Sequence, residues 1–344
     1  MKAYIILFFL ACQGVVSLAQ DNKTPYLTKS LSGDAVKKVF VSTSGGSITV
    51  SGASGETARV EVYITGNNGI VPSNDEIKKR LEDDYSLDVS VSNNEVHAVA
   101  KNKHNGGDWD WRKSLNIAFK VYVPENVATN LETSGGSIHL DNLKGEEKFS
   151  TSGGSLHIDK LSGNIHGRTS GGSITVSNSS ENIDLETSGG SVHADNCSGT
   201  IRLETSGGSL HLDQLNGKID ATTSGGSVQA SNIKGEMHAG TSGGSVNLTN
   251  LYCSLDTYTS GGSLHVQMTE LGKYVKIDVS SGHVDLQLPS KQGADLNLHG
   301  NKVTAELGDN FSGTKDKDKV EGKLNGGGVP VDVNGGGRVN LTLN

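Results

Sequence analysis

Four histidines lie 18 or 36 residues apart in the middle of this 344-residue sequence, each followed two positions later by an aspartate. Imidazole and carboxylate groups that lie close together can bind zinc or copper, so these pairs are the first candidates for chemistry. Thr175, Gln229 and Asn247 take the place of the histidine in other units, and no outer residues that would orient the imidazoles are evident. We therefore predict a solvated polar face or a pH-sensitive surface, with no metal and no cofactor. The pairs are His139 and Asp141, His157 and Asp159, His193 and Asp195, and His211 and Asp213.

Both tryptophans of the chain, Trp109 and Trp111, lie in the glycine-rich segment 105–111. Indole rings at a loop tip could stack on sugars or grip a protein, because aromatic side chains dominate binding surfaces. They could equally cover the end of a repeat array, where an apolar core would otherwise meet water. We favour the covering role, and keep Trp109 and Trp111, with the four histidines, as the candidate ligand-binding residues.

The pentapeptide Thr-Ser-Gly-Gly-Ser occurs nine times and sets the organisation of the chain. Eight copies start 18 residues apart, from Thr133 to Thr259, and one stands apart at Thr43. Apolar, polar and apolar residues alternate after each copy, and a second such strand follows a turn. One unit cannot bury its apolar side alone, whereas coils stacked about 4.8 Å apart share a core. We predict an all-β, right-handed parallel β-solenoid with 18-residue coils over residues 131–344.

The glycine pairs of the pentapeptide are predicted to be the corners of the coils. A corner must reverse the chain within about two residues, and glycine supplies the positive φ that other residues tolerate badly. The flanking Ser and Thr are small enough to stack on their counterparts in neighbouring coils as hydroxyl ladders. The predicted corner glycines are Gly135, Gly136, Gly153, Gly154, Gly171, Gly172, Gly189, Gly190, Gly207, Gly208, Gly225, Gly226, Gly243, Gly244, Gly261 and Gly262.

Several known solenoid classes do not fit the repeat. Left-handed hexapeptide acyltransferases need an apolar residue every six positions, but Lys144 stands six residues after Ile138, so we favour the right-handed form. The calcium-binding Gly-Gly-x-Gly-x-Asp nonapeptide is also absent. Ice-binding solenoids need flat outward threonine columns, whereas threonine is expected to point inward here.

Catalysis is not expected on the array. Polysaccharide-active β-helix enzymes wall their clefts with long loops between strands, yet seven successive units carry no insertion. Without such walls, water exclusion and converging catalytic groups are hard to arrange. A polysaccharide-active enzyme is the third interpretation of the chain.

Residues 20–130 are predicted to form an N-terminal strand and capping region. Ser73 and Glu76 form a capping box that predicts a helix near residues 75–85. Strands are expected around 59–64, 87–91, 96–100 and 115–123, and the whole insert should cover the N-terminal end of the array.

The C-terminal flank continues the array with irregular spacing. Ser281-Gly282 is a degenerate corner, and further corners are expected at 326–328 and 335–337. The alternating charges of residues 315–319 indicate a solvated loop. We expect the solenoid to run on to Asn344.

Residues 1–19 have the features of a secretory signal, with Lys2, an apolar run and small residues before Gln20. The mature protein is predicted to be exported to the periplasm, the outer-membrane surface or the medium; a lipoprotein acylated at Cys12 is less favoured. Cys197 and Cys253 should lie about 14 Å apart along the stack, too far for a disulfide. The net charge of −8 is interspersed along the chain, which disfavours a nucleic-acid partner.

The pentapeptide repeats, together with the glycine-rich ending at 326–341, resemble the bacterial adhesin-like family of β-strand-repeat proteins, also called toast-rack or head domains. The likeness covers roughly residues 130–344 and the copy at 42–50. It implies the repeat fold and brings no catalytic motif. Some relatives are associated with cell-envelope stress systems, which supplies an alternative to adhesion.

Together these features predict a noncatalytic, exported, adhesin-like β-solenoid that binds an envelope polymer, a glycan or a protein. The alternative is a periplasmic component of an envelope-stress or signalling system. The oligomeric state stays open.

Overall fold

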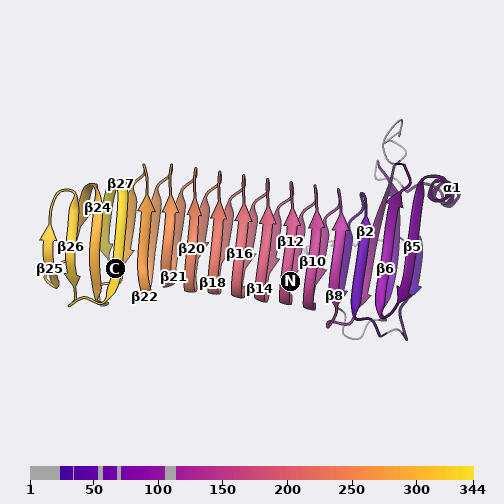
Figure 1. Ribbon diagram of the computed structural model, residues 1–344, viewed down its shortest axis with the longest axis horizontal. Helices are drawn as coiled ribbons and strands as arrows, with labels where there is room; N and C mark the ends of the chain where they lie inside the picture. Colours follow the sequence, from indigo (N-terminus) through magenta and orange to yellow (C-terminus); the bar gives the residue numbers. More distant parts are fainter. Residues whose placement is uncertain (1–23, 34, 53–56, 68–70, 105–113) are drawn as a thin grey trace, which may run out of the picture.

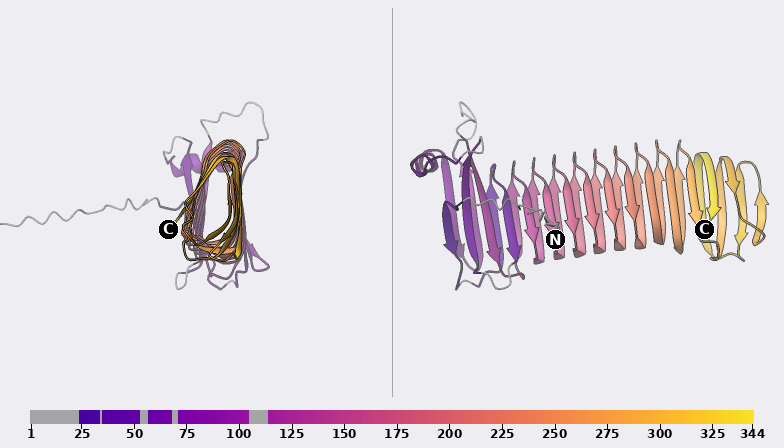
Figure 2. Two further views of the ribbon diagram at one scale, coloured as in Figure 1. Left: turned by 90° about the vertical axis from the view of Figure 1, so that its left-hand side faces the viewer. Right: turned by 180° about the vertical axis from the view of Figure 1, so that it is seen from behind.

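A computed structural model describes residues 24–33, 35–52, 57–67, 71–104 and 114–344, which form a straight rod of stacked coils (Figure 1). Seen along the rod, the coils superpose as one flattened ring (Figure 2). Residues 18 apart pair in parallel, as Thr151 does with Thr169 and Thr169 with Thr187. These pairings confirm the predicted all-β parallel solenoid with 18-residue coils, while its right-handed sense stays a prediction.

Each coil has one long and one short strand, so the rod has a long-strand face and a short-strand face. The long strands are β8 (Ala128–Thr133), β10 (Lys144–Thr151), β12 (Ser162–Thr169), β14 (Ser180–Thr187), β16 (Ser198–Thr205), β18 (Asn216–Thr223) and β20 (Lys234–Thr241). The short strands are β9 (Ile138–Asp141), β11 (Leu156–Asp159), β13 (Ile174–Ser177), β15 (Val192–Asp195), β17 (Leu210–Asp213) and β19 (Val228–Ser231). Both strands of a coil merge into one element in β21 (Val246–Thr259) and β22 (Leu264–Val279), and β23 (Val284–Leu288) follows.

Glycine is needed at these corners because neighbouring coils approach closely there, and not because the backbone takes a left-handed φ. None of the corner glycines of the pentapeptides, from Gly135 to Gly262, has a left-handed φ, so the positive-φ explanation is wrong for them. A Cβ on the second glycine of a pair would lie 1.9–2.1 Å from the carbonyl oxygen of its counterpart in the preceding coil, as Gly208 shows against Gly190. A Cβ on the first glycine, such as Gly207, meets its nearest atoms at 3.4–3.9 Å, which is ordinary contact. Only the second glycine is therefore required by packing.

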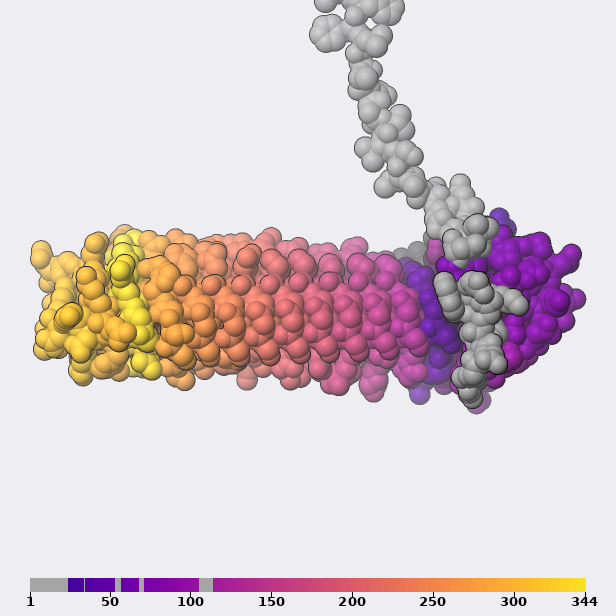
Figure 3. Space-filling view, turned by 90° about the horizontal axis from the view of Figure 1, so that it is seen from above, coloured from indigo at the N-terminus to yellow at the C-terminus, as the bar shows by residue number. Residues whose placement is uncertain are grey.

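Hydroxyl groups join the corners of neighbouring coils. The buried Oγ1 of Thr205 donates to the carbonyl of Gly190 at 2.8 Å and accepts from the amide of Gly208 at 3.2 Å. The pattern recurs from Thr133 to Thr259. The last serine of the pentapeptide adds a second row of bonds: the Ser209 amide donates to Ser191 Oγ at 3.2 Å. Ser and Thr therefore stack on their counterparts, but their hydroxyls bond to backbone groups and not to one another. Figure 3 shows evenly spaced rows of atoms along the rod, as the regular stacking of coils requires.

The left-handed backbone conformation lies at the opposite corner of each coil. Residues there have φ between 50° and 58°, a region that Asn tolerates better than most residues. We call them the asparagine column: Asn142, Lys160, Asn178, Asn196, Gln214, Asn232 and Asn250.

Inward side chains form columns through the core, and one column contains a carboxylate. Ile165, Ile183 and Ile201 occupy equivalent buried positions, but the preceding coil places Glu147 there, with no exposed surface. Its Oε2 accepts from Thr129 Oγ1 at 2.5 Å, whereas Oε1 has no partner. Burial raises the pKa of Glu147 to about 7, although the Thr129 hydrogen bond acts in the opposite direction.

The outlying pentapeptide forms the first coil of the stack. In β2 (Lys38–Thr43) and β3 (Ile48–Gly52), Thr43 pairs with Thr133 and Ile48 with Ile138, so the chain leaves after this coil and returns to continue it. The intervening insert extends both faces with antiparallel strands. On one face β5 (Tyr85–Ser92) pairs with β6 (Glu95–Asn102), and on the other β4 (Arg59–Gly66) pairs with β7 (Leu115–Val123). β6 and β7 join the coil in parallel.

The expected elements of the insert are confirmed. They are β4 (Arg59–Gly66), β5 (Tyr85–Ser92), β6 (Glu95–Asn102) and β7 (Leu115–Val123), with β1 (Leu27–Ser30) added at the edge of β4. Helix α1 (Asn74–Asp84) is capped by Ser73, whose side chain accepts from the Glu76 amide at 3.3 Å, and it buries Ile77. Figure 1 shows α1 at the N-terminal end of the rod.

The C-terminal strand is inserted into the stack instead of ending it. β27 (Val329–Leu343) lies between β22 and β23 on one side and β24 (Ala294–Ala305) on the other. The expected corner at 335–337 stacks on Ser280–Gly282, whereas Gly326–Gly328 turn the chain from an antiparallel strand into β27. β25 (Phe311–Lys315) and β26 (Lys319–Leu324) form a hairpin at the end of the rod, joined by the predicted solvated turn. The solenoid therefore includes the C-terminus, but the outermost strands come from 311–324.

Cys197 and Cys253 are free and buried, as the distance between their coils predicts, and burial raises the pKa of the Cys253 thiol to about 12. Within the described ranges, no helix is long and apolar enough to cross a bilayer. The predicted signal segment 1–19 lies outside the described residues.

The two glycines of one corner should respond differently to a methyl group. We expect Gly208→Ala to lower the free energy of unfolding by more than about 2 kcal/mol, because its Cβ would collide with a backbone oxygen that cannot move alone. Gly207→Ala is the matched control, with an expected change below about 1 kcal/mol. Denaturant unfolding measures both, and equal losses would contradict the steric explanation.

Replacing the buried carboxylate should remove a pH dependence. The folded pKa of Glu147, about 7, lies above its unfolded value, so its contribution to stability is full below about pH 4 and is lost as the pH rises towards 7. We expect Glu147→Ile, which completes the isoleucine column, to gain about 3 kcal/mol over the wild type between pH 4 and pH 8. Unfolding at the two pH values tests this, with Glu146→Gln as the exposed control. A pH-independent difference would show that Glu147 does not titrate in the fold.

Candidate ligand-binding face

Two polar columns run along the short-strand face. Equivalent residues pair one coil apart, as His157 does with His139 and Asp159 with Asp141. We call the first the histidine column: His139, His157, Thr175, His193, His211, Gln229, Asn247 and His265. The second is the aspartate column: Asp141, Asp159, Ser177, Asp195, Asp213, Ser231 and Thr249.

The candidate histidines are brought together as two stacked pairs. The ring centroids of His139 and His157 are 4.6 Å apart with planes 12° from parallel, and those of His193 and His211 are 4.7 Å apart at 4°. Burial, and then the charge of the neighbouring ring, lower the pKa of His139 and of His211. Two protonated rings at this distance repel each other, so a pair holds a second proton poorly. His139 and His211 are therefore harder to protonate than a free imidazole.

Two of the four aspartates, Asp159 and Asp213, are held by hydrogen bonds from the next coil. Asp213 Oδ1 accepts from Ser231 Oγ at 2.6 Å and from Asn232 Nδ2 at 2.7 Å, and these bonds lower the pKa of Asp213. Asp159 is bound in the same way by Ser177 and Asn178. Among the described residues, no three His, Cys, Asp or Glu side chains are grouped to hold a metal ion. The columns instead present fixed hydrogen-bond acceptors in an ordered row.

A hollow of about 430 Å³ lies where the histidine column changes to amides. Its rim combines imidazoles, carboxylates, hydroxyls and amides, and the Nδ1 atom of His211 is buried there without a hydrogen-bond partner. The hollow is lined by Thr175, Val176, Ser177, His193, Ala194, Asp195, His211, Leu212, Asp213, Gln229, Ala230, Ser231, Asn247 and Thr249.

The long-strand face differs because its charges neutralise one another. Asp184 lies 2.8 Å from His166 and 3.4 Å from Arg202, which also contacts Glu204 at 2.6 Å. Exposed ion pairs of this kind contribute little to stability. They do leave fewer free charged groups for a ligand, so the short-strand face is the better candidate.

Sequence reasoning missed the asparagine column, which adjoins the aspartate column. Asn196 Nδ2 donates to Asn178 Oδ1 at 2.7 Å, and Asn232 likewise accepts from Asn250. The 18-residue recurrence of these amides was the signal that could have found them. Trp109 and Trp111 lie outside the described residues, so their covering role stays a prediction.

Comparison with known proteins identifies the family. The family model for Toastrack DUF4097 matches residues 17–335. This chain belongs to the Toastrack family. The match agrees with the resemblance carried by the pentapeptide repeats. No curated protein matches the sequence.

Two solved structures are similar to this Toastrack chain at low identity. A proposed cell adhesion protein from Clostridium sporogenes is 10% identical, with a TM-score of 0.20 over 92% of this chain and 98% of its own. A proposed adhesin from Bacteroides fragilis is 12% identical, with a TM-score of 0.31 over 76% of this chain and 96% of its own. The family assignment rests on the sequence match alone.

Removing one ring of a stacked pair should change the proton affinity of the other. We expect His157→Gln to raise the pKa of His139, because one of the two causes that lower it is removed while burial remains. His193→Gln, three coils away, should leave the His139 pKa unchanged. NMR titration of the imidazole resonances measures both variants. An unmoved His139 pKa in His157→Gln would mean that the rings are not electrostatically coupled.

Proposed function

We propose that this protein is a noncatalytic, exported, adhesin-like component of the cell periphery that binds an envelope polymer, a glycan or a protein. The observation that carries the proposal is the uninterrupted stack of coils. Each coil places its outward side chains about 4.8 Å from those of the next, on a backbone bonded from coil to coil. Such a rod offers a polymer many equivalent contacts without the entropy cost of ordering loops.

The geometry of the short-strand face favours binding over catalysis. The coils from β8 to β20 carry no loop that would wall a cleft. Burial raises the pKa of Asp159, but Lys160, Asn178 and Ser177 together lower it. Ser231 and Asn232 lower the pKa of Asp213. Carboxylates that stay ionised suit a fixed acceptor better than a proton donor. The hollow on this face supplies donors and acceptors of several kinds, which suits recognition.

Export is supported by the sequence of residues 1–19, which combines a basic residue, an apolar run and small residues before Gln20. An exported rod with a regular polar face is suited to contact with the cell envelope.

A binding assay on isolated envelopes tests the function. We expect the mature protein, residues 20–344, to bind envelope fractions saturably and to release no sugar fragments from envelope polysaccharides. Gln229→Glu/Asn247→Glu, which adds charge to the hollow, should weaken binding about tenfold. Thr200→Glu/Thr222→Glu adds the same charge to the long-strand face and is the matched control. Absence of binding, or sustained turnover of a polysaccharide, would overturn the proposal.

A further inference from the structure

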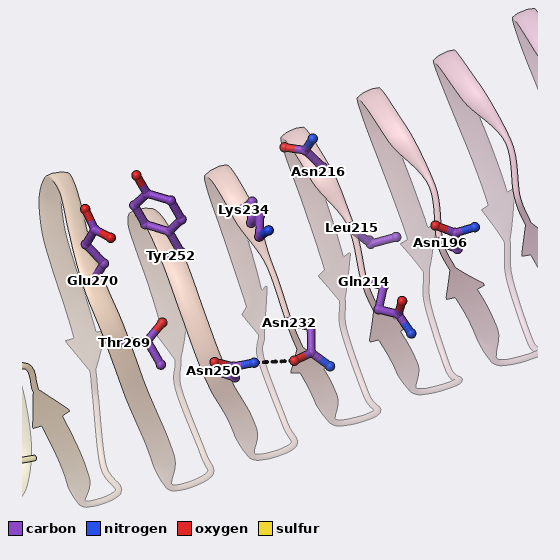
Figure 4. A pocket seen from close by; sticks show the side chains of 10 residues that line it. All are labelled: Asn196, Gln214, Leu215, Asn216, Asn232, Lys234, Asn250, Tyr252, Thr269 and Glu270. Carbon is purple, nitrogen blue, oxygen red and sulfur yellow. Dashed lines mark hydrogen bonds between the residues drawn. The ribbon is translucent and has the colours of Figure 1, made fainter.

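A second hollow lies around the corner from the short-strand face. It has a volume of about 680 Å³ and runs across several coils, as Figure 4 shows. We call it the corner groove. One wall is the asparagine column, with Asn196, Gln214, Asn232 and Asn250. The other wall contains Asn216, Lys234, Tyr252 and Glu270, which pair in succession on neighbouring strands, and Leu215 and Thr269 complete the lining.

The stability of the coil does not explain the presence of Tyr252. Its side chain is 46% exposed, and among the described residues of the coil stack, 128–288, it is the only large apolar side chain so exposed. Equivalent positions hold polar residues, which are serine in coils such as those of Ser180 and Ser198 and the charged Lys234 and Glu270 in the two adjoining coils. The fold therefore accepts a small residue at this position and does not require an aromatic ring there. An exposed aromatic ring in a groove is a typical ligand anchor.

The amides of the asparagine column are oriented but not saturated. Asn232 Nδ2 donates to Asp213 Oδ1 at 2.7 Å, and Asn232 Oδ1 accepts from Asn250 Nδ2. Each amide has two N–H donors and an oxygen with two lone pairs, so half of this capacity remains for a ligand. Fixing the amides in a row lowers the entropy cost of binding.

The opposite wall is entirely unused within the fold. Among the described residues, the side chains of Asn216, Lys234, Tyr252 and Glu270 make no hydrogen bond or ion pair. Lys234 and Glu270 carry opposite charges on either side of Tyr252, so the wall has no net charge. A single lysine beside carboxylates is a poor site for a polyanion.

Sugar chemistry fits these groups best. Hydroxyl groups both donate and accept, which matches amides that offer both functions, and the apolar face of a sugar ring can stack on tyrosine. A peptide would instead need an open strand edge or a row of apolar pockets, and the groove has neither along its walls. Because an amide recurs in each of the five coils from Asn178 to Asn250, a polymer of repeating sugars laid along the rod meets them in sequence.

We propose that the corner groove binds a neutral polysaccharide chain lying along the coil stack, with Tyr252 stacked on a sugar ring and Asn232 and Asn250 bonded to its hydroxyls. This assignment rests on the proposed function, since it names the ligand class and adds a second place of contact, around the corner from the hollow of the short-strand face.

Calorimetric titration with soluble neutral polysaccharides, a β-glucan, a mannan and a galactan, tests the site. We expect at least one to bind, and oligosaccharides cut from it to bind more tightly as they lengthen across successive coils. Tyr252→Ser, a residue that other coils carry at this position, should weaken binding about tenfold or more. Asn250→Leu should weaken it as well, through loss of the amide.

The control is Tyr258→Ser, which removes a tyrosine from the long-strand face beside His238 and should leave binding within about twofold of the wild type. Unfolding curves confirm that each variant is folded. Envelope binding that survives Tyr252→Ser and Asn250→Leu unchanged, or binding only to anionic polymers or to proteins, would overturn this inference while the proposed function stands. Failure of the wild-type protein to bind envelopes would overturn the proposed function itself.

Discussion

Strands can pair at their normal spacing in this rod only because each corner lets the next coil approach its backbone. The second glycine of each pentapeptide lies so close to the coil before it that a methyl group there would come within 1.9–2.1 Å of a carbonyl oxygen. The buried threonine closes the same corner by bonding one glycine carbonyl and one glycine amide. Close approach and hydrogen bonding thus act on the same atoms, which explains why threonine and glycine recur together.

This constraint turns every other position into a column of like environments. Inward columns favour aliphatic residues of complementary size, as where Phe149 fills the space that Gly167 leaves in the next coil. Outward columns bring equivalent side chains of neighbouring coils into contact, and the type of side chain decides how they interact. Imidazoles stack on the short-strand face, whereas acids and bases alternate on the long-strand face and form ion pairs.

Local and periodic features could be predicted from the sequence, and long-range pairings could not. The 18-residue period gave the coils, their register and the stacked histidines, and the Ser73 capping box gave α1. Periodicity carries no information about a segment that leaves the stack. The repeat pattern therefore did not predict that β8 pairs with β2, the strand of Thr43, or that β27 lies between earlier strands. The role of the glycines was misjudged because a repeated glycine is compatible with either positive φ or close approach, and only coordinates distinguish the two.

The candidate site shows a further reason why a sequence repeat does not reveal the residues that bind a ligand. Columns such as Thr205 and Gly208 are repeated because the fold demands them, so repetition marks structure. A specific binding site needs a side chain that the neighbouring coils lack, and such a side chain occurs where the sequence departs from the 18-residue repeat. Tyr252 is an aromatic residue in a column of polar residues, just as Glu147 is a carboxylate at a core position that isoleucine occupies in the following coils. A search for repeats passes over both, although each is the position in its column whose physical properties are least explained by the stack. In a solenoid of this regularity, the irregular positions are therefore the places to look for function.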